Sequence, residues 1–215
     1  MFPEVGKSFE YEKGLIHIGG EVTVETLLEA YHKGIFPWYS PENPPLWWSP
    51  DPRFVLYLDK LKVRRSLQKR VRNGGFEIKF DTQFRRVVEH CRDLRSDDTW
   101  IDDDIVNAYT ELYNLGYAHS VEVYLEKKLV GGLYGVSLGK MFFGESMFSL
   151  ERDASKVALV KLTEKLKEWK FDLIDAQIYS EHLESLGAIE IDREDFLSQL
   201  KESLKSESKI GKWSF

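Results

Sequence analysis

The order of apolar and polar residues predicts regular structure over most of the chain. After Thr23, apolar residues recur at helical spacing until Gly34, which predicts a short helix capped by the threonine hydroxyl. Residues 35–52 then hold six of the seven prolines and three of the six tryptophans. Because proline interrupts helices and central strands, we expect an ordered loop held by packed aromatic rings. The alternative for one or two of these rings is that they line an apolar pocket.

The rest of the pattern switches between a period of two and a period of 3.6 residues. It predicts strands over residues 76–80, 119–125, 129–138, 141–149, 171–179 and 188–191. It predicts helices over residues 63–72, from Asp81, over 102–115, 153–169 and 182–186, and at the C-terminus. The three central strands are joined by short turns and should be antiparallel. This mixed α+β layout follows the element order of the N-acetyltransferase-like fold, in which a central helix follows the third or fourth strand.

The composition of the sequence changes at Lys60, from a stretch rich in Trp and Pro to a basic one. This change predicts two domains. Residues 1–61 would form a small N-terminal domain rich in Trp and Pro, and residues 62–215 a larger acetyltransferase-like domain with a mixed sheet. A length of 215 residues and an apolar fraction of 42% allow both the division and a packed core.

Charge is unevenly distributed. The formal net charge of −6 gives no general reason to expect nucleic-acid binding. Residues 60–72, however, hold seven basic and no acidic side chains, and a helix there would bury Leu67 and Val71 under a cationic surface. A solvated helix face and a contact with phosphate groups are both open explanations of this run.

Several classes of protein are excluded by residues that the sequence lacks. Cys91 is the only cysteine and has apolar flanks, so we expect a core position and no internal disulfide. No His-x-x-x-His or Cys-x-x-Cys spacing occurs, so we expect no metal. No apolar run approaches the roughly 18 residues of a membrane span, and the N-terminus lacks the order of a secretory signal. We therefore expect a cytoplasmic protein that does not enter a membrane.

Residues 141–149 combine apolar side chains with two polar ones, Glu145 and Ser146. Burying a lone glutamate among Phe and Met side chains is costly unless it has a partner. One possibility is that the strand bulges at Gly144 and lets Glu145 reach solvent. The other is a polar notch in an apolar pocket, suited to gripping an ammonium group.

A second polar pair lies on the following predicted strand. Asp175 and Gln177 alternate along it and so should share one face. The aspartate can accept a proton and the amide can orient a neighbouring group. Polar strand edges are common, so the pair alone is also consistent with a purely structural role.

Nine segments carry further motifs: GIFPW at 34–38, LWWSPDPR at 46–53, TWI at 99–101, AHSVE at 118–122, LVGGLYGV at 129–136, FGESMFS at 143–149, ASK at 154–156, LIDAQ at 173–177 and SLGA at 185–188. Together, and in this order, they resemble the leucyl/phenylalanyl-tRNA–protein transferase family over about residues 14–196. The resemblance implies a cytoplasmic enzyme without metal or cofactor whose partners are Leu-tRNA and Phe-tRNA. It implies transfer of Leu or Phe, with Met as a further donor, to proteins that begin with Lys or Arg. These products would be marked for degradation through the N-degron pathway.

The resemblance also implies roles for individual residues. It places Asp175 and Gln177 in a proton relay around the attacking amine, with Glu145 as a polar anchor beside the reacting groups. The residues matching substrate-pocket positions are Trp38, Trp100, Phe142, Ser146 and Met147.

Contact with the tRNA acceptor end is implied only by basic character, at Arg64, Arg65, Lys69 and Arg70. The chain departs from the family at Glu184, where relatives often have a small residue. This adds a carboxylate near the expected pocket rim and bears on acceptor preference.

Two other functions compete with this interpretation. An acetyl-CoA-dependent N-acyltransferase would share the fold but needs a glycine-rich turn before the central helix, where residues 151–156 have no glycine and two acids. A tRNA- or peptide-binding module would have no transfer activity.

Overall fold

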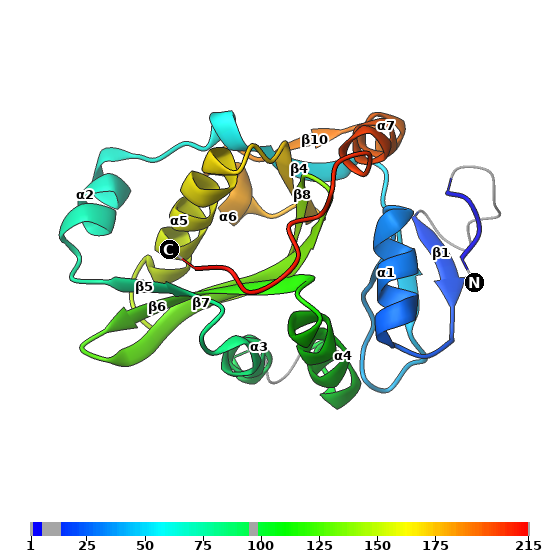
Figure 1. Ribbon diagram of the computed structural model, residues 1–215, viewed down its shortest axis with the longest axis horizontal. Helices are drawn as coiled ribbons and strands as arrows, with labels where there is room; N and C mark the ends of the chain where they lie inside the picture. Colours follow the sequence, from blue (N-terminus) through cyan, green and yellow to red (C-terminus); the bar gives the residue numbers. More distant parts are fainter. Residues whose placement is uncertain (1, 6–13, 95–98, 215) are drawn as a thin grey trace.

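The computed structural model describes residues 2–5, 14–94 and 99–214. Its strands form two sheets (Figure 1): a three-stranded sheet in the order β1-β3-β2 and a seven-stranded sheet in the order β10-β4-β9-β8-β7-β6-β5. The small sheet lies with α1 at the N-terminal side of the molecule, and the large sheet carries the remaining helices. No helix among the described residues has the length and apolar character needed to cross a membrane.

The N-terminal module consists of β1 (Leu15–Ile18), α1 (Val24–His32), β2 (Phe36–Pro37) and β3 (Leu46–Trp48). The predicted helix is confirmed, because Thr23 and Thr26 form a reciprocal capping box at its start. The prediction of a loop over residues 35–52 is wrong in part, since β2 and β3 pair as antiparallel strands there. Pro37 is tolerated because β2 is an edge strand of the small sheet.

The large sheet is mixed and lies between two layers of helices, which confirms the α+β class. Its strands are β4 (Arg53–Tyr57), β5 (Glu77–Phe80), β6 (Ala118–Leu125), β7 (Lys128–Leu138), β8 (Met141–Ser149), β9 (Leu173–Gln177) and β10 (Ile189–Ile191). The other helical segments are η1 (Leu58–Lys60), α2 (Arg65–Asn73), α3 (Phe84–Asp93), α4 (Asp103–Asn114), α5 (Ala154–Glu168), α6 (Glu181–Glu184) and α7 (Arg193–Ser203). One face packs against α5 and the other against α3 and α4 (Figure 1).

The element order matches the expectation for an acetyltransferase-like domain. Strands β5 to β8 are antiparallel neighbours, and the long helix α5 then leads to β9, which pairs with β8 in parallel. A parallel pair requires such a crossover, whereas the antiparallel pairs need only short turns. The short connections seen in the sequence therefore predicted strand direction correctly.

One strand of the large sheet lies outside the segment expected to form it. Strand β4 pairs with β10 on one side and with β9 on the other, although residues 1–61 were expected to form the small domain. By strand pairing, a boundary would lie before Arg53. One cluster of buried apolar side chains also includes residues of α1, α3 and α4, so the division into two domains stays a prediction.

The helix predicted to begin at Asp81 begins three residues later. Helix α3 begins at Phe84, and Asp81 does not cap it. The Asp81 side chain is fully buried, and its carboxylate binds His119 Nδ1 at 2.8 Å and accepts hydrogen bonds from the backbone N–H groups of Ser120 and Trp213. A buried carboxylate needs such partners, which explains why it turns inward instead of capping the helix.

Candidate functional site

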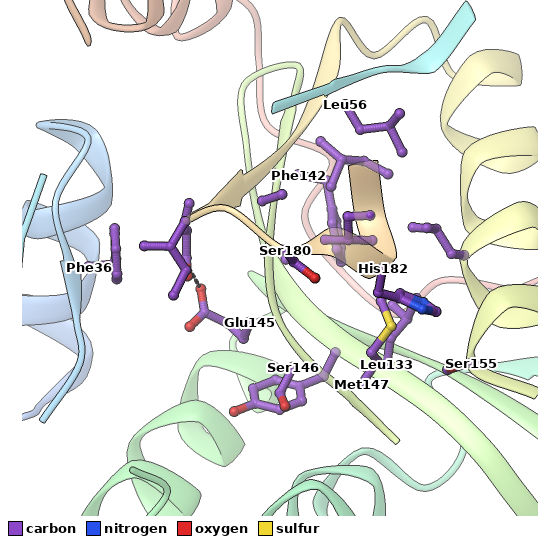
Figure 2. A pocket seen from close by; sticks show the side chains of 18 of the residues that line it. Phe36, Leu56, Leu133, Phe142, Glu145, Ser146, Met147, Ser155, Ser180 and His182 are labelled. Carbon is purple, nitrogen blue, oxygen red and sulfur yellow. Dashed lines mark hydrogen bonds between the residues drawn. The ribbon is translucent and has the colours of Figure 1, made fainter. Parts of the chain in front are cut away.

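A cavity of about 570 Å³ opens where two parallel strands stop pairing. Strands β8 and β9 are paired up to Phe143 and Asp175, but β8 continues to Ser149. Beyond that point the cavity is bounded by β8, the end of β9, α5 and α6 (Figure 2). Most of its wall is apolar, with side chains that include Leu56, Leu133, Phe142, Met147, Leu159 and Ile174.

Glu145 is the acidic side chain that lines this cavity among the described residues. In the pairing of β7 with β8, Tyr134 lies opposite Ser146 and Gly135 opposite Gly144, so Glu145 is the extra residue of a β-bulge. The expected bulge is therefore present, but it does not direct Glu145 to bulk solvent. The carboxylate turns toward the cavity and the N-terminal module (Figure 2).

Three donors hold the Glu145 carboxylate. Its Oε1 accepts hydrogen bonds from the Tyr31 hydroxyl and from Gln177 Nε2, both at 2.7 Å. Its Oε2 accepts one from the Tyr109 hydroxyl at 3.0 Å. The two tyrosine hydroxyls also contact each other. The donors come from α1, α4 and the end of β9, so three separate elements fix one carboxylate.

The same surroundings set the protonation of Glu145. Burial raises its pKa to about 7, although the hydrogen bonds from Tyr31, Tyr109 and Gln177 act in the opposite direction. The nearby negative charge of Asp175 raises the pKa further. A carboxyl group with a pKa close to neutrality can both accept and return a proton under physiological conditions.

The two tyrosines remain hydrogen-bond donors near neutral pH. Burial raises the pKa of Tyr31 and of Tyr109 well above the usual value, and the adjacent Glu145 charge adds to the effect. Neither hydroxyl therefore competes with Glu145 as the group that titrates. They stabilise its charged form and fix its orientation.

Asp175 is brought close to this site but does not line the cavity. Its side chain is fully buried, and both carboxylate oxygens bind Arg53, with Nε at 2.8 Å and Nη2 at 2.6 Å. Arg53 is equally buried and donates a third hydrogen bond to the Gly34 carbonyl. A carboxylate held in this two-pronged ion pair is not available to a substrate amine.

The expectation that Asp175 and Gln177 share a strand face fails for a local reason. The pairing of β4 with β9 shifts register between Asp175 and Gln177, so the alternation is broken at Ala176. Gln177 also has a positive φ of 66°, and its backbone N–H donates to Asp175 Oδ1. Its side chain turns to the cavity and to Glu145, whereas Asp175 turns to Arg53.

The structure brings all five expected pocket residues to this one cavity. Trp38 stands at the open rim and is 43% exposed, whereas Trp100, Phe142 and Ser146 are buried. Met147 is half-buried and lies opposite Leu133 in the pairing of β7 with β8 (Figure 2). The Ser146 hydroxyl is buried and has no hydrogen-bond partner among the described residues, so it can serve a bound molecule.

The four expected tRNA contacts lie elsewhere, on and beside α2. Arg64, Arg65 and Lys69 are exposed, and Arg70 is half-buried because its guanidinium lies over the Phe76 ring. None of them lines the cavity. Helix α2 packs against α5, which also forms part of the cavity wall, so a long substrate could contact both α2 and the cavity.

Sequence reasoning missed three residues of the site. Tyr31 and Tyr109 fit the apolar stripes of their helices and so resemble core residues, while Arg53 ends a proline-rich motif with no sign of a partner. A tyrosine in an apolar helix stripe must place its hydroxyl somewhere, and that requirement was the available signal.

No group of three or more His, Cys, Asp or Glu residues is placed to hold a metal ion within the described ranges. Glu145 is surrounded by tyrosine hydroxyls and an amide, which suit a carboxylate better than a cation.

Comparison with known proteins identifies two family models. Residues 55–201 match the model described as leucyl/phenylalanyl-tRNA protein transferase, and residues 20–51 match its N-terminal domain. Curated proteins named leucyl/phenylalanyl-tRNA–protein transferase are similar over nearly the whole chain. That of Hydrogenovibrio crunogenus is 48% identical and covers 100% of this chain and 85% of the relative, and that of Thiobacillus denitrificans is 49% identical with 100% and 95% covered.

Solved structures are more distant. An aminoglycoside acetyltransferase from a soil metagenome is 12% identical, with 66% of this chain and 97% of that chain covered and a TM-score of 0.41. L-PGS from Bacillus licheniformis is 11% identical, with 75% and 55% covered and a TM-score of 0.41.

Proposed function

The chain belongs to the leucyl/phenylalanyl-tRNA–protein transferase family and is an aminoacyltransferase, and from this premise we propose its substrates and its catalytic residues. It transfers Leu or Phe, with Met as a further donor, from aminoacyl-tRNA to the α-amino group of proteins that begin with Lys or Arg. The products are thereby marked for N-degron degradation. The observation that most supports the proposed transfer is the position of Glu145, whose titratable carboxylate is held at one end of an apolar cavity.

The apolar part of the cavity takes the donor side chain. Phe142, Met147, Trp38 and Trp100 would surround a Leu or Phe residue, and burial of its apolar surface supplies the affinity. The buried Ser146 hydroxyl would bind a polar group of the donor, next to Glu145. An apolar wall of this kind discriminates between side chains by fit, at about 1–3 kcal/mol per methylene.

Glu145 is the group best suited to handle the proton of the reaction. The acceptor arrives as an ammonium ion and must lose a proton before its nitrogen can attack the ester carbonyl carbon of the aminoacyl-tRNA. A new C–N bond then forms and the ester C–O bond breaks. In becoming an amide the nitrogen gives up two protons: Glu145 takes one and returns it to the departing ribose oxygen of the tRNA, and the other is released to solvent.

Gln177 and Asp175 act through Glu145. The Gln177 amide donates directly to Glu145, and Asp175 holds the Gln177 backbone while it is itself held by Arg53. We therefore assign Gln177 to orienting the carboxylate and Asp175 to positioning Gln177. This differs from a proton relay that begins at Asp175, because both of its oxygens are occupied by Arg53.

The exposed cations beside and on α2 are assigned to the tRNA. Arg64, Arg65 and Lys69 have no acidic residue among their neighbours along the chain from residue 60 to 72. Neutralising phosphates in this way releases counterions and makes affinity depend on salt. The body of a tRNA is large enough to lie on α2 while its aminoacyl end enters the cavity.

An acetyl-CoA-dependent reaction is less well supported. At the start of α5, the Ser155 N–H already donates to the Ser149 hydroxyl, and the Ala154 N–H donates to the Glu151 carbonyl. Helix N-terminal N–H groups bind pyrophosphate only when they are free to point at it.

The test is to incubate the protein with labelled Leu-tRNA and peptides that begin with Arg, Lys or Gly, with an N-acetylated Arg peptide as the control. We expect label in the Arg and Lys peptides and none in the blocked peptide. Transfer that requires acetyl-CoA would instead support the rival acyltransferase. Binding of Leu-tRNA without transfer to any peptide would support a binding module.

A further inference from the structure

The segment that follows α7 packs against the back of the cavity wall. After α7, the chain crosses the large sheet and reaches the region of α5 (Figure 1). Trp213, in this segment, is 2% exposed and belongs to the apolar cluster that also contains Phe142. A residue in an irregular segment beyond the last helix is seldom so deeply buried unless it has been tied down.

Trp213 is fixed from several directions. Its backbone N–H donates to Asp81 Oδ2 at 2.7 Å, and its indole N–H donates to the Lys209 carbonyl at 3.2 Å. Its ring stacks on His119, with centroids 3.6 Å apart and planes inclined by 8°. Asp81 also binds His119, so one buried carboxylate holds both the backbone of Trp213 and the ring on which it stacks.

The Trp213 ring contacts Phe142, with centroids 5.9 Å apart. Phe142 lines the cavity, and its ring also lies close against Gly135. A Cβ atom at Gly135 would come within 2.6 Å of the Phe142 ring. The Phe142 ring is therefore in contact with both Gly135 and Trp213, and it also forms part of the cavity wall.

From this arrangement we infer that Trp213 is a positioning residue for donor selectivity: it holds the Phe142 ring against the cavity and so sets the space offered to the donor side chain. The inference rests on the proposed function, in which that cavity takes the donor side chain. Removing the indole would let the Phe142 ring withdraw from the cavity. The enlarged cavity would then favour the bulkier Phe over Leu, because an apolar wall discriminates between side chains by how well they fit.

The experiment compares kcat/KM for Phe-tRNA with kcat/KM for Leu-tRNA in four proteins: the wild type, Trp213→Ala, Trp213→Phe and Leu166→Ala. Leu166 is the matched control, since it is fully buried in the same apolar cluster but does not line the cavity. Its truncation lowers stability without removing a side chain that lines the cavity. Each protein is assayed below the temperature at which unfolding begins, which is measured separately.

We expect the Phe-to-Leu ratio to rise about fivefold in Trp213→Ala, less than the roughly 10–200-fold that a whole methylene can give. Trp213→Phe keeps an aromatic ring and should raise the ratio about twofold, which also carries the test if the alanine variant does not fold. Leu166→Ala should leave the ratio unchanged. An unchanged ratio in Trp213→Phe and in any folded Trp213→Ala, or an equal rise in Leu166→Ala, would overturn the inference. The proposed function fails separately, if the wild type transfers neither amino acid.

Discussion

Both carboxylate oxygens of Asp175 bind the guanidinium of Arg53, and neither side chain is exposed. The guanidinium also donates to the Gly34 carbonyl of the N-terminal module and lies over the rings of Phe36 and Phe196. The ion pair thus joins the N-terminal module, β4 and β9 at the point where Gln177 enters the site. The Arg53–Asp175 ion pair therefore has a structural role: it holds these three parts together next to the cavity.

Arg53→Met should lower the free energy of unfolding by about 3–5 kcal/mol, because it leaves the buried Asp175 charge without a partner. Urea unfolding followed by tryptophan fluorescence measures this. Arg85→Met is the control, since the Arg85–Glu89 pair is exposed and worth less than about 1 kcal/mol. Equal effects of the two substitutions would contradict the assignment of Arg53 as a buried joint.

Asp175→Asn should slow transfer by displacing Gln177 while keeping the rise of the rate with pH. The group that titrates is Glu145, whose pKa is raised by the Asp175 charge. Removing that charge should move the rise to slightly lower pH. A pH–rate profile of single-turnover transfer checks this, and a profile whose only rise lies at the α-amino pKa of about 7.7–8.0 would return the role of proton acceptor to Asp175.

Tyr109→Phe should move the same rise to higher pH. The Tyr109 hydroxyl donates to the charged form of Glu145 and lowers its pKa, so its loss should raise that pKa. Tyr113→Phe on the same helix is the control, because the Tyr113 hydroxyl donates to the Asp81 carbonyl and not to Glu145. A shift to lower pH, or an equal shift in the control, would be inconsistent with the hydrogen-bond network.

Replacing Arg64, Arg65 and Lys69 together by Ala should weaken the use of tRNA and make it less sensitive to salt. The slope of log kcat/KM against log salt is negative for a phosphate-binding protein. Because three phosphate-binding side chains are removed, this slope should become less negative by about two. The preference for Leu over Phe should not change, because these residues do not line the cavity. Lys127→Ala/Lys128→Ala, in an exposed hairpin, is the control. An unchanged slope in the triple variant would exclude α2 as the tRNA contact.

Much of the fold followed from the sequence because its signals are local. The strands β6, β7 and β8 and the helix α5 were predicted to within a few residues from periodicity and short turns. Strand β4 was missed because it directly follows a proline-rich segment, which was expected to form a loop. Its identity as a strand depends on pairing with β9 and β10, which are distant in the sequence.

The site was predictable where a polar residue interrupted an apolar pattern, as at Glu145. It was not predictable where the partner was remote: Tyr31 is 114 residues from Glu145, and Arg53 is 122 residues from Asp175. Alternation placed Asp175 beside Gln177 on one face, and only the register shift between them reveals that they point to different partners. Single-residue insertions of this kind leave no periodic trace in a short strand.

We assign to Glu145 the acceptance of the proton from the incoming amine, and Glu145→Gln removes that acceptor. Single-turnover transfer of labelled Leu to an Arg peptide is measured against pH for the wild type and the variant. The wild-type rate should rise through a pKa of about 7. The variant should be slower by about 10²–10⁴-fold, with its remaining rise set by the α-amino group itself, at about 7.7–8.0. A Glu145→Gln protein that kept both the rate and the pH dependence of the wild type would contradict this account.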